Sequence, residues 1–178
     1  MSEGFAFPYG MCPHCGGKLQ ALERPEVSGA AGLAAIRSAF EIELGGRTFY
    51  TRAAKEASDP TLQQLFLSFA AMEEEHMTTL AHRYHVALPE ASEGFHIGTA
   101  AIMVGVEGKI DDPETLFQAA IEFERRAAAF FKTRVHETPD GSIERQLYRE
   151  LAAEEDEHVA LLQTEFAQWL KGKHGLLT

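Results

Sequence analysis

The stretch FAAMEEEH at residues 69–76 recurs 82 residues later as LAAEEDEH at residues 151–158. Both copies contain the pattern Glu-x-x-His, and apolar residues precede both. Residues three apart on a helix project from the same face, so the two side chains of each pair can reach one metal ion. The pairs are Glu73 with His76, and Glu155 with His158.

A second repeat lies upstream of each pair. The stretch AFEIE at residues 39–43 matches AIEFE at residues 120–124, which follows after 81 residues. It adds Glu43 and Glu124 to the repeated acids. The separation changes by one residue between helices, where an extra loop residue costs little free energy. We therefore interpret the chain as two related helical hairpins, each with one Glu in its first helix and Glu-x-x-His in its second.

Helical periodicity predicts four helices, at about residues 29–57, 60–84, 113–136 and 142–170. Asp59-Pro60 and Asp112-Pro113 are typical helix starts, with an N-cap followed by proline. Short loops within each hairpin favour antiparallel pairs. On the first helix, the predicted buried stripe comprises Leu33, Ile36, Phe40, Leu44 and Phe49.

Between the second and third helices lie roughly 28 residues, from 85 to 112. A connection of this length can cross the whole of a bundle, as a ferritin-like topology requires. The predicted fold is thus an all-α four-helix bundle of two hairpins joined by a long crossover. We expect the bundle to occupy residues 28–178 and a cysteine knuckle with its linker to occupy residues 1–27.

Composition limits the classes of partner. The 178 residues are 45% hydrophobic, and 27 acidic against 16 basic residues give a net charge of -11. This charge disfavours nucleic acid and anionic membranes, which carry the same sign. No run of 18 apolar residues is present, and the first residues lack the basic start of a secretory signal. We expect a cytoplasmic location.

The repeated acids and histidines suit a metal centre. Carboxylate with neutral imidazole favours iron or manganese, with zinc also possible, and several carboxylates offset the charge of two buried ions. Four helices that each contribute a Glu, two of them with Glu-x-x-His, form the arrangement of di-iron and di-manganese carboxylate bundles. The predicted ligands are Glu43, Glu73, His76, Glu124, Glu155 and His158.

Single occurrences of the motif carry little information. Glu93 and His96 form a third Glu-x-x-His, in a glycine-containing segment with no counterpart. It is the doubling at a fixed spacing that favours a ligand set over a solvated helix face. Six further acids depart from the repeat, and we expect them to face solvent or to support the ligands: Glu41, Glu74, Glu75, Glu122, Asp156 and Glu157.

From about residue 29 to residue 170 the chain resembles the rubrerythrin-like branch of the ferritin-like superfamily. The shared pattern is a first-helix Glu, an aromatic residue seven positions later, and Glu-x-x-His in the second helix, all repeated once. The resemblance implies a di-iron centre that reacts with hydrogen peroxide or dioxygen, an external electron donor, and a homodimer or larger homo-oligomer. It also implies that Tyr50 lies near the metals as a hydrogen-bond donor or radical trap. As a bare sequence feature, a tyrosine at such a position is more often a core aromatic residue with a polar tip.

Three features depart from the family pattern. Phe131 stands where a second tyrosine would be, and the positions after Glu124 are Arg125, Arg126, Ala127 and Ala128. Typical rubrerythrins have an additional glutamate ligand there, so the expected site has six ligands. The chain also lacks the four cysteines of a rubredoxin domain. Besides peroxide or dioxygen reduction, Fe(II) oxidation, iron binding and delivery with little turnover, and a purely structural role remain open.

Two short features complete the prediction. Gly45 and Gly46 follow Glu43 inside a predicted helix, and we favour close helix packing as the reason, with access to the metals and a harmless break in the helix as alternatives. Cys12-Pro-His-Cys15 looks like half of a zinc-ribbon or rubredoxin knuckle, since two thiolates supply half of a tetrahedral site. A second subunit's copy would complete a shared zinc or iron site. A redox dithiol and a vestigial motif are the alternatives.

Overall fold

The computed structural model describes residues 10–11, 18–19, 29–84, 112–173, 175 and 177. Its helices are α1 (Ala30–Glu56), α2 (Pro60–Tyr84), α4 (Pro113–Glu137) and α5 (Ile143–Trp169). All four begin and end within one residue of the predicted bounds. Two short strands, β1 (Gly10–Met11) and β2 (Lys18–Leu19), pair antiparallel, with Gly10 opposite Leu19. Cys12, Cys15 and the predicted crossover at residues 85–111 lie outside the described residues.

The helix starts are those expected from the sequence. The Asp59 carboxylate accepts hydrogen bonds from the backbone N–H groups of Thr61 and Leu62. The Asp112 carboxylate accepts one from the Thr115 N–H at 2.9 Å, and the Ser142 hydroxyl caps α5 through the Arg145 N–H. These caps satisfy donors that a helix leaves unpaired at its first turn.

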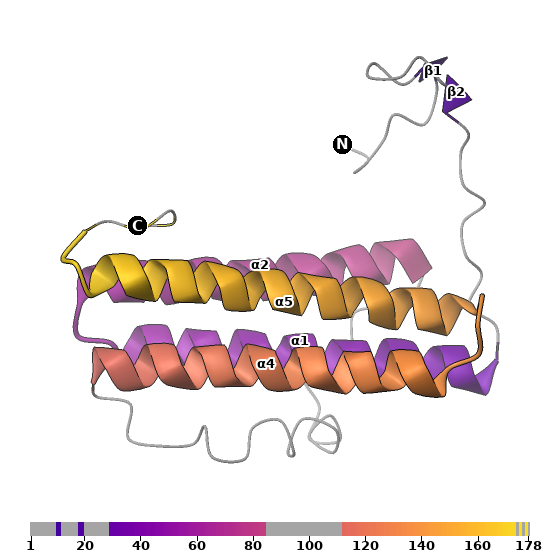
Figure 1. Cartoon of the computed structure of the whole chain (residues 1–178), viewed down its shortest axis with the longest axis horizontal. Helices are drawn as coiled ribbons and strands as arrows, with labels where there is room; N and C mark the ends of the chain where they lie inside the picture. The colour runs from indigo at the N-terminus through magenta and orange to yellow at the C-terminus, as the bar shows by residue number, and fades with distance from the viewer. Residues whose placement is uncertain are drawn as a thin grey trace.

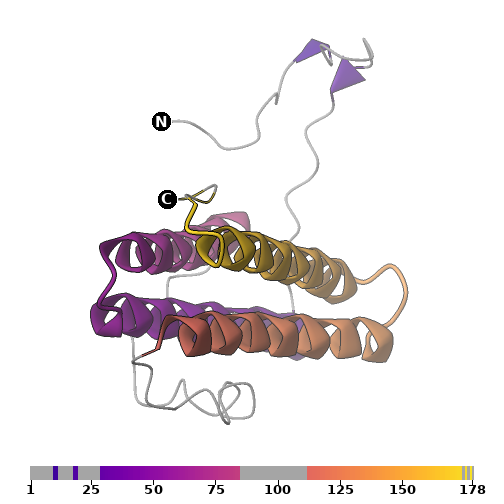
Figure 2. The ribbon, with the colours of Figure 1, turned by 60° about the vertical axis from the view of Figure 1, so that its left-hand side comes forward.

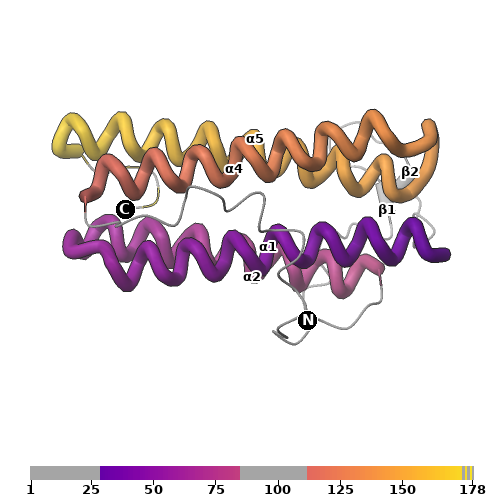
Figure 3. The backbone as a smooth tube through the Cα atoms, turned by 90° about the horizontal axis from the view of Figure 1, so that it is seen from below, coloured from indigo at the N-terminus to yellow at the C-terminus, as the bar shows by residue number. Residues whose placement is uncertain are grey.

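The helices pack as two antiparallel hairpins, α1 with α2 and α4 with α5 (Figure 1). The hairpins lie side by side, so that α1 and α4 form one layer and α2 and α5 the other (Figures 2 and 3). Phe49 of α1 stacks on Phe123 of α4, and Arg83 of α2 pairs with Glu150 of α5. The predicted all-α bundle of two hairpins is therefore confirmed.

The buried core divides into two apolar clusters, which we call the Tyr50 cluster and the Phe131 cluster. The first includes Tyr50, Phe66 and Phe117, and the second includes Phe40 and Phe131. Along every helix the residues of one cluster precede those of the other. The predicted metal ligands fall near the boundary between them on each helix, so the polar residues of the bundle meet between two apolar layers.

One prediction about the faces of α1 was wrong. Leu33, predicted to be buried, is 54% exposed near the start of the helix. Glu41, expected to face solvent or to support the ligands, is buried at 8% exposure, and its carboxylate pairs with the Arg37 guanidinium at 3.1 Å. The two residues lie one helical turn apart, which places the guanidinium within reach of the acid. Within residues 29–84 and 112–173, no helix is long and apolar enough to cross a membrane.

Candidate metal centre

Four glutamates and two histidines, one acid from every helix, meet in the middle of the bundle. The glutamates are essentially inaccessible, at 0% to 1% exposure. His158 is 5% exposed, whereas the side chain of His76 retains 20%. Burial of four carboxyl groups would be very costly without compensating protons or cations. The members are Glu43 on α1, Glu73 and His76 on α2, Glu124 on α4, and Glu155 and His158 on α5.

The first group that can hold a metal ion is Glu43, Glu73 and His76. His76 Nδ1 lies 3.0 Å from Glu43 Oε2 and 4.0 Å from Glu73 Oε2. Each residue offers one ligand atom, and these atoms lie within 4.8 Å of one another. We call this group the outer position, because the half-buried His76 connects it to the protein surface.

The second group is Glu73, Glu124 and His158, with Glu155 beside it. His158 Nδ1 lies 3.7 Å from Glu73 Oε1 and 3.6 Å from Glu124 Oε1. It lies 3.4 Å from Glu155 Oε2. Ligands bound to one ion at about 2.0–2.2 Å are themselves roughly 3–3.5 Å apart, so these separations are close to those of a metal shell. We call this fully buried group the inner position.

Glu73 belongs to both positions. Its Oε2 is the atom near His76, and its Oε1 is the atom near His158. The two imidazole rings are stacked, with centroids 5.0 Å apart and planes 5° apart. The two positions are therefore neighbours, and Glu73 is placed to bridge them.

Several polar atoms of the centre have no hydrogen-bond partner. Such orphans are rare in folded proteins, because each costs about 1–3 kcal/mol, and more when charged. Bound cations would satisfy all of them at once, and carboxylate oxygens with an imidazole nitrogen form a donor set suited to iron, manganese or zinc. The residues present thus fit a pair of metal ions. The orphaned atoms are Glu43 Oε1, Glu73 Oε1, Glu124 Oε2, Glu155 Oε2 and His158 Nδ1.

The pKa values of the buried acids reflect their burial and their closeness to one another. Burial raises the pKa of Glu73 and Glu155 well above the ordinary value, and the charge of Glu124 raises both further. Burial also opposes ionisation of Glu124, but His158, Glu155 and Tyr50 outweigh it and hold the pKa of Glu124 below its usual range. Of these three acids, Glu124 is therefore the most ready to carry a negative charge, whereas burial favours the protonated forms of Glu73 and Glu155.

Tyr50 lies against the inner position. Its ring is fully buried in the Tyr50 cluster, where it stacks on Phe69 at 5.0 Å. Its hydroxyl donates a hydrogen bond to Glu124 Oε1. Burial raises the pKa of Tyr50, and the adjacent Glu124 raises it further, so the phenol keeps its proton. The counterpart Phe131 has no hydroxyl, so the hydrogen bond is made in one half of the repeat.

The absence of a side chain at Gly46 leaves space for the Glu73 carboxylate. A Cβ placed on Gly46 would lie 2.8 Å from Glu73 Cδ and 3.0 Å from its Oε1. This contact explains why a residue of low helix propensity occupies a helix interior. The counterpart in the second hairpin is Ala127, which is fully buried and is one of the four positions after Glu124 that lack an additional glutamate.

The acids expected outside the centre mostly lie at the surface. Glu74 pairs with Arg47, Glu122 with Arg126 and Asp156 with Lys132. Glu75 and Glu157 are exposed. Glu154 was not predicted as a candidate functional residue. The sequence does distinguish it, since Glu154 stands where the first hairpin has the apolar Met72.

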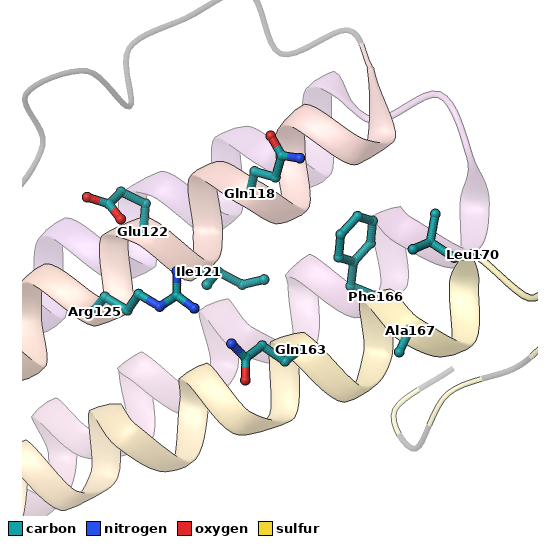
Figure 4. Close-up of a pocket in the computed structure, with 8 residues that line it drawn as sticks. All are labelled: Gln118, Ile121, Glu122, Arg125, Gln163, Phe166, Ala167 and Leu170. Carbon is teal, nitrogen blue, oxygen red and sulfur yellow. The ribbon is translucent and has the colours of Figure 1, made fainter.

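A surface pocket of about 510 Å³ lies apart from the centre, between the first half of α4 and the last turns of α5 (Figure 4). Its walls combine Gln118, Arg125 and Gln163 with the ring of Phe166. None of the six predicted ligands lines it.

Comparison of the chain with protein-family models, with curated proteins and with solved structures found no match. The functional assignment therefore depends on the residues of the centre and on their geometry.

Proposed function

We propose that this chain is a ferritin-like di-iron protein whose centre reacts with hydrogen peroxide or dioxygen, or oxidises Fe(II). The observation that carries the proposal is the set of orphaned, fully buried carboxylate and imidazole atoms between two apolar clusters. Carboxylates on a protein surface are hydrated by solvent and so do not require a bound cation. A structural role is disfavoured, because hydrogen bonding within the centre leaves these atoms unsatisfied.

In the proposed centre, Glu43 and His76 would hold the ion at the outer position, and Glu124 and His158 would hold the ion at the inner position. Glu73 would belong to both, since one of its oxygens faces each histidine. Glu155 would complete the inner position, since its carboxylate lies 3.4 Å from His158. When bound, iron supplies one-electron redox chemistry toward peroxide or dioxygen. Manganese or zinc fits the same donors.

The remaining residues of the chain prepare the environment of this chemistry. The two apolar clusters exclude water, which strengthens every charge interaction inside. Tyr50 holds a proton on its hydroxyl, directed at Glu124 Oε1. This proton orients the carboxylate and lies beside the inner position. Reduction of the centre after each turnover requires an external electron donor.

The absence of a second glutamate one turn after Glu124 separates this centre from that of typical rubrerythrins. Residues 125–128 are Arg, Arg, Ala and Ala, so α4 offers one carboxylate, Glu124, to the centre. The proposed site thus has six protein ligands, as in a simple ferritin-like centre. Peroxide, dioxygen and Fe(II) are the substrates we propose to compare.

The test is anaerobic loading of the protein with two equivalents of Fe(II), followed by rapid mixing with peroxide or with dioxygen. We expect oxidation within seconds and repeated turnover when a reductant is supplied. The matched control is Glu73→Ala, which removes the acid shared by both positions. Iron that binds but is oxidised no faster than free Fe(II) would instead identify an iron-binding and delivery protein. Failure of the wild type to bind iron, manganese or zinc contradicts the proposal.

Two further proposals concern assembly. We propose a homodimer or larger homo-oligomer, in which Cys12 and Cys15 from two subunits hold zinc or iron. Sedimentation of the purified protein, with metal analysis before and after Cys12→Ser, tests both. A monomer without a thiolate-bound metal contradicts them and leaves the proposal for the bundle unaffected.

A further inference from the structure

The starting point is the line on the bundle surface where α2 meets α5, which we call the α2–α5 seam (Figure 1). Two contacts mark one half of it. Arg83 of α2 donates two hydrogen bonds to the carboxylate of Glu150 on α5, and His76 of α2 stacks on His158 of α5. Glu154 is four residues from both Glu150 and His158, and one helical turn is 3.6 residues. It therefore lies on the edge of α5 that faces α2, between the two contacts.

Glu154 is an unneutralised acid at this place. It is exposed, and it makes no hydrogen bond or ion pair with any residue in the described part of the chain. Its neighbour along the seam, Glu150, is neutralised by Arg83. Glu154 lies one helical turn before His158, whose ring stacks on that of His76 with centroids 5.0 Å apart, so it lies on the His76 side of α5 beside the outer position.

The outer position is also where the centre reaches the surface. The His76 side chain is 20% exposed and that of His158 is 7% exposed. Behind His76 lies Glu43, whose Oε1 is fully buried and has no hydrogen-bond partner. An exposed acid, a half-buried imidazole and an unpartnered buried carboxylate thus follow one another from the surface inward.

The equivalent place in the other half of the repeat is closed. Met72 occupies the position that corresponds to Glu154, and it is half-buried against the Tyr50 cluster. Glu165 corresponds to Arg83, but it is buried at 2% exposure and accepts a hydrogen bond from the Leu177 N–H at 3.0 Å. Leu177 itself packs on the Tyr50 cluster. This half of the seam offers an apolar and covered surface.

We propose that Glu154 captures divalent cations at the surface and transfers them past His76 to Glu43, which makes this half of the seam the metal entrance of the bundle. The inference rests on the proposed metal centre and adds the route by which ions reach it. Capture is a ligand exchange: water leaves the cation, the Glu154 carboxylate binds it, and the buried ligands then replace Glu154. No electron is transferred in this step.

An acid at the mouth of such a route raises the local concentration of cations and their rate of entry. It contributes little to the final affinity, because the bound ions rest on the buried ligands. Loss of Glu154 should therefore change the rate of metal uptake and not its stoichiometry. The effect should also decrease at high salt, because Glu154 is exposed to solvent.

The experiment uses Co(II) as the probe, added anaerobically to the metal-free full-length chain and followed by its visible absorbance in stopped flow. Two equivalents should bind in the wild type and in Glu154→Gln, with uptake roughly threefold or more slower in the variant. Glu154→Met, which copies Met72, should be at least as slow. Glu157→Gln is the matched control, since it removes the same charge from an exposed position on α5 and should leave the rate unchanged.

The outcomes separate the two proposals. If Glu154→Gln takes up Co(II) as fast as Glu157→Gln while both bind two equivalents, the entrance is refuted and the metal centre stands. If the wild type binds no Co(II), Mn(II) or Fe(II), both are refuted. A rate for Glu154→Gln that falls with unchanged stoichiometry supports the entrance. Far-ultraviolet circular dichroism of each variant confirms that the helices are intact.

Discussion

At the scale of single residues, the function of the centre depends most on Glu73. Glu43 and Glu124 each contact one histidine, whereas the two oxygens of Glu73 face His76 and His158. The orphaned Oε1 of Glu73 lies on the His158 side. A carboxylate placed between two positions can hold two cations at a distance where they would otherwise repel each other.

Substitution of Glu73 should therefore affect both positions. We expect Glu73→Ala to reduce bound metal to well below one ion per chain, because each position loses a ligand. Glu43→Ala removes a ligand from the outer position alone and should leave about one ion. Metal analysis after exhaustive dialysis distinguishes the two. Equal stoichiometry in both variants contradicts the bridging role.

Tyr50 and Glu124 provide a second residue-scale prediction. Tyr50→Phe removes a buried hydrogen bond to a carboxylate, which should lower the free energy of unfolding by about 1.5–3 kcal/mol. Metal stoichiometry should remain two, because the phenol is not a proposed ligand. Tyr148→Phe is the control, since Tyr148 is also buried but makes no hydrogen bond with the described residues. Chemical denaturation measures both, and equal stability of the two variants refutes the assigned contact.

At the scale of the helices, the sequence predicted most of the architecture. The bounds followed from caps and prolines, whose effects are local, and the ligand set followed from the repeat. The burial of Glu41 did not follow from the sequence, because burial depends on which elements pack around α1. Glu154 was missed because the ligand prediction followed residues shared by the two hairpins, and Met72 stands at the corresponding position of the first hairpin. Periodicity predicts which face of a helix is buried, but not what a neighbouring helix brings to its edge.

The interior of α1 carries a prediction that separates helix stability from metal binding. Alanine at position 46 would favour the helix by about 1 kcal/mol over glycine. Its Cβ would lie 2.8 Å from Glu73 Cδ, so the carboxylate must move. We expect Gly46→Ala to retain its helical content and to lose metal affinity by tenfold or more. Gly45→Ala is the control, because Gly45 is half-buried and lies about 100° around the helix from Gly46. Unchanged affinity in Gly46→Ala would show that Glu73 does not need this space.

At the scale of the whole molecule, the metal-free protein should become less stable as pH rises. The pKa values of Glu73 and Glu155 are raised in the folded state above the ordinary 4.5. Their protonated forms therefore favour the fold fully below about pH 4.5, and this contribution is lost as pH rises through the folded pKa. The pKa of Glu124 is lowered in the folded state, so its contribution to the free energy of unfolding changes only below about pH 4.5. The pKa of His76 is raised, so its contribution to stability is lost as pH rises, as for Glu73.

Calorimetry of the metal-free chain between pH 5 and pH 8 measures this dependence. We expect Tm to fall with pH, and Glu73→Gln to flatten the slope, because glutamine cannot ionise. Addition of Fe(II) or Mn(II) at pH 8 should restore Tm, since cations replace the protons on the buried acids. A Tm that rises with pH in the metal-free protein contradicts the assigned pKa directions.

The bundle as a whole places a polar layer between two apolar clusters, and the central claim is that this layer binds two metal ions. Anomalous scattering at the iron edge, from crystals of iron-loaded protein, tests it most directly. The account predicts two peaks, one between Glu43, Glu73 and His76, and one between Glu73, Glu124 and His158. Peaks elsewhere, or no peak among these residues in fully loaded crystals, would contradict it.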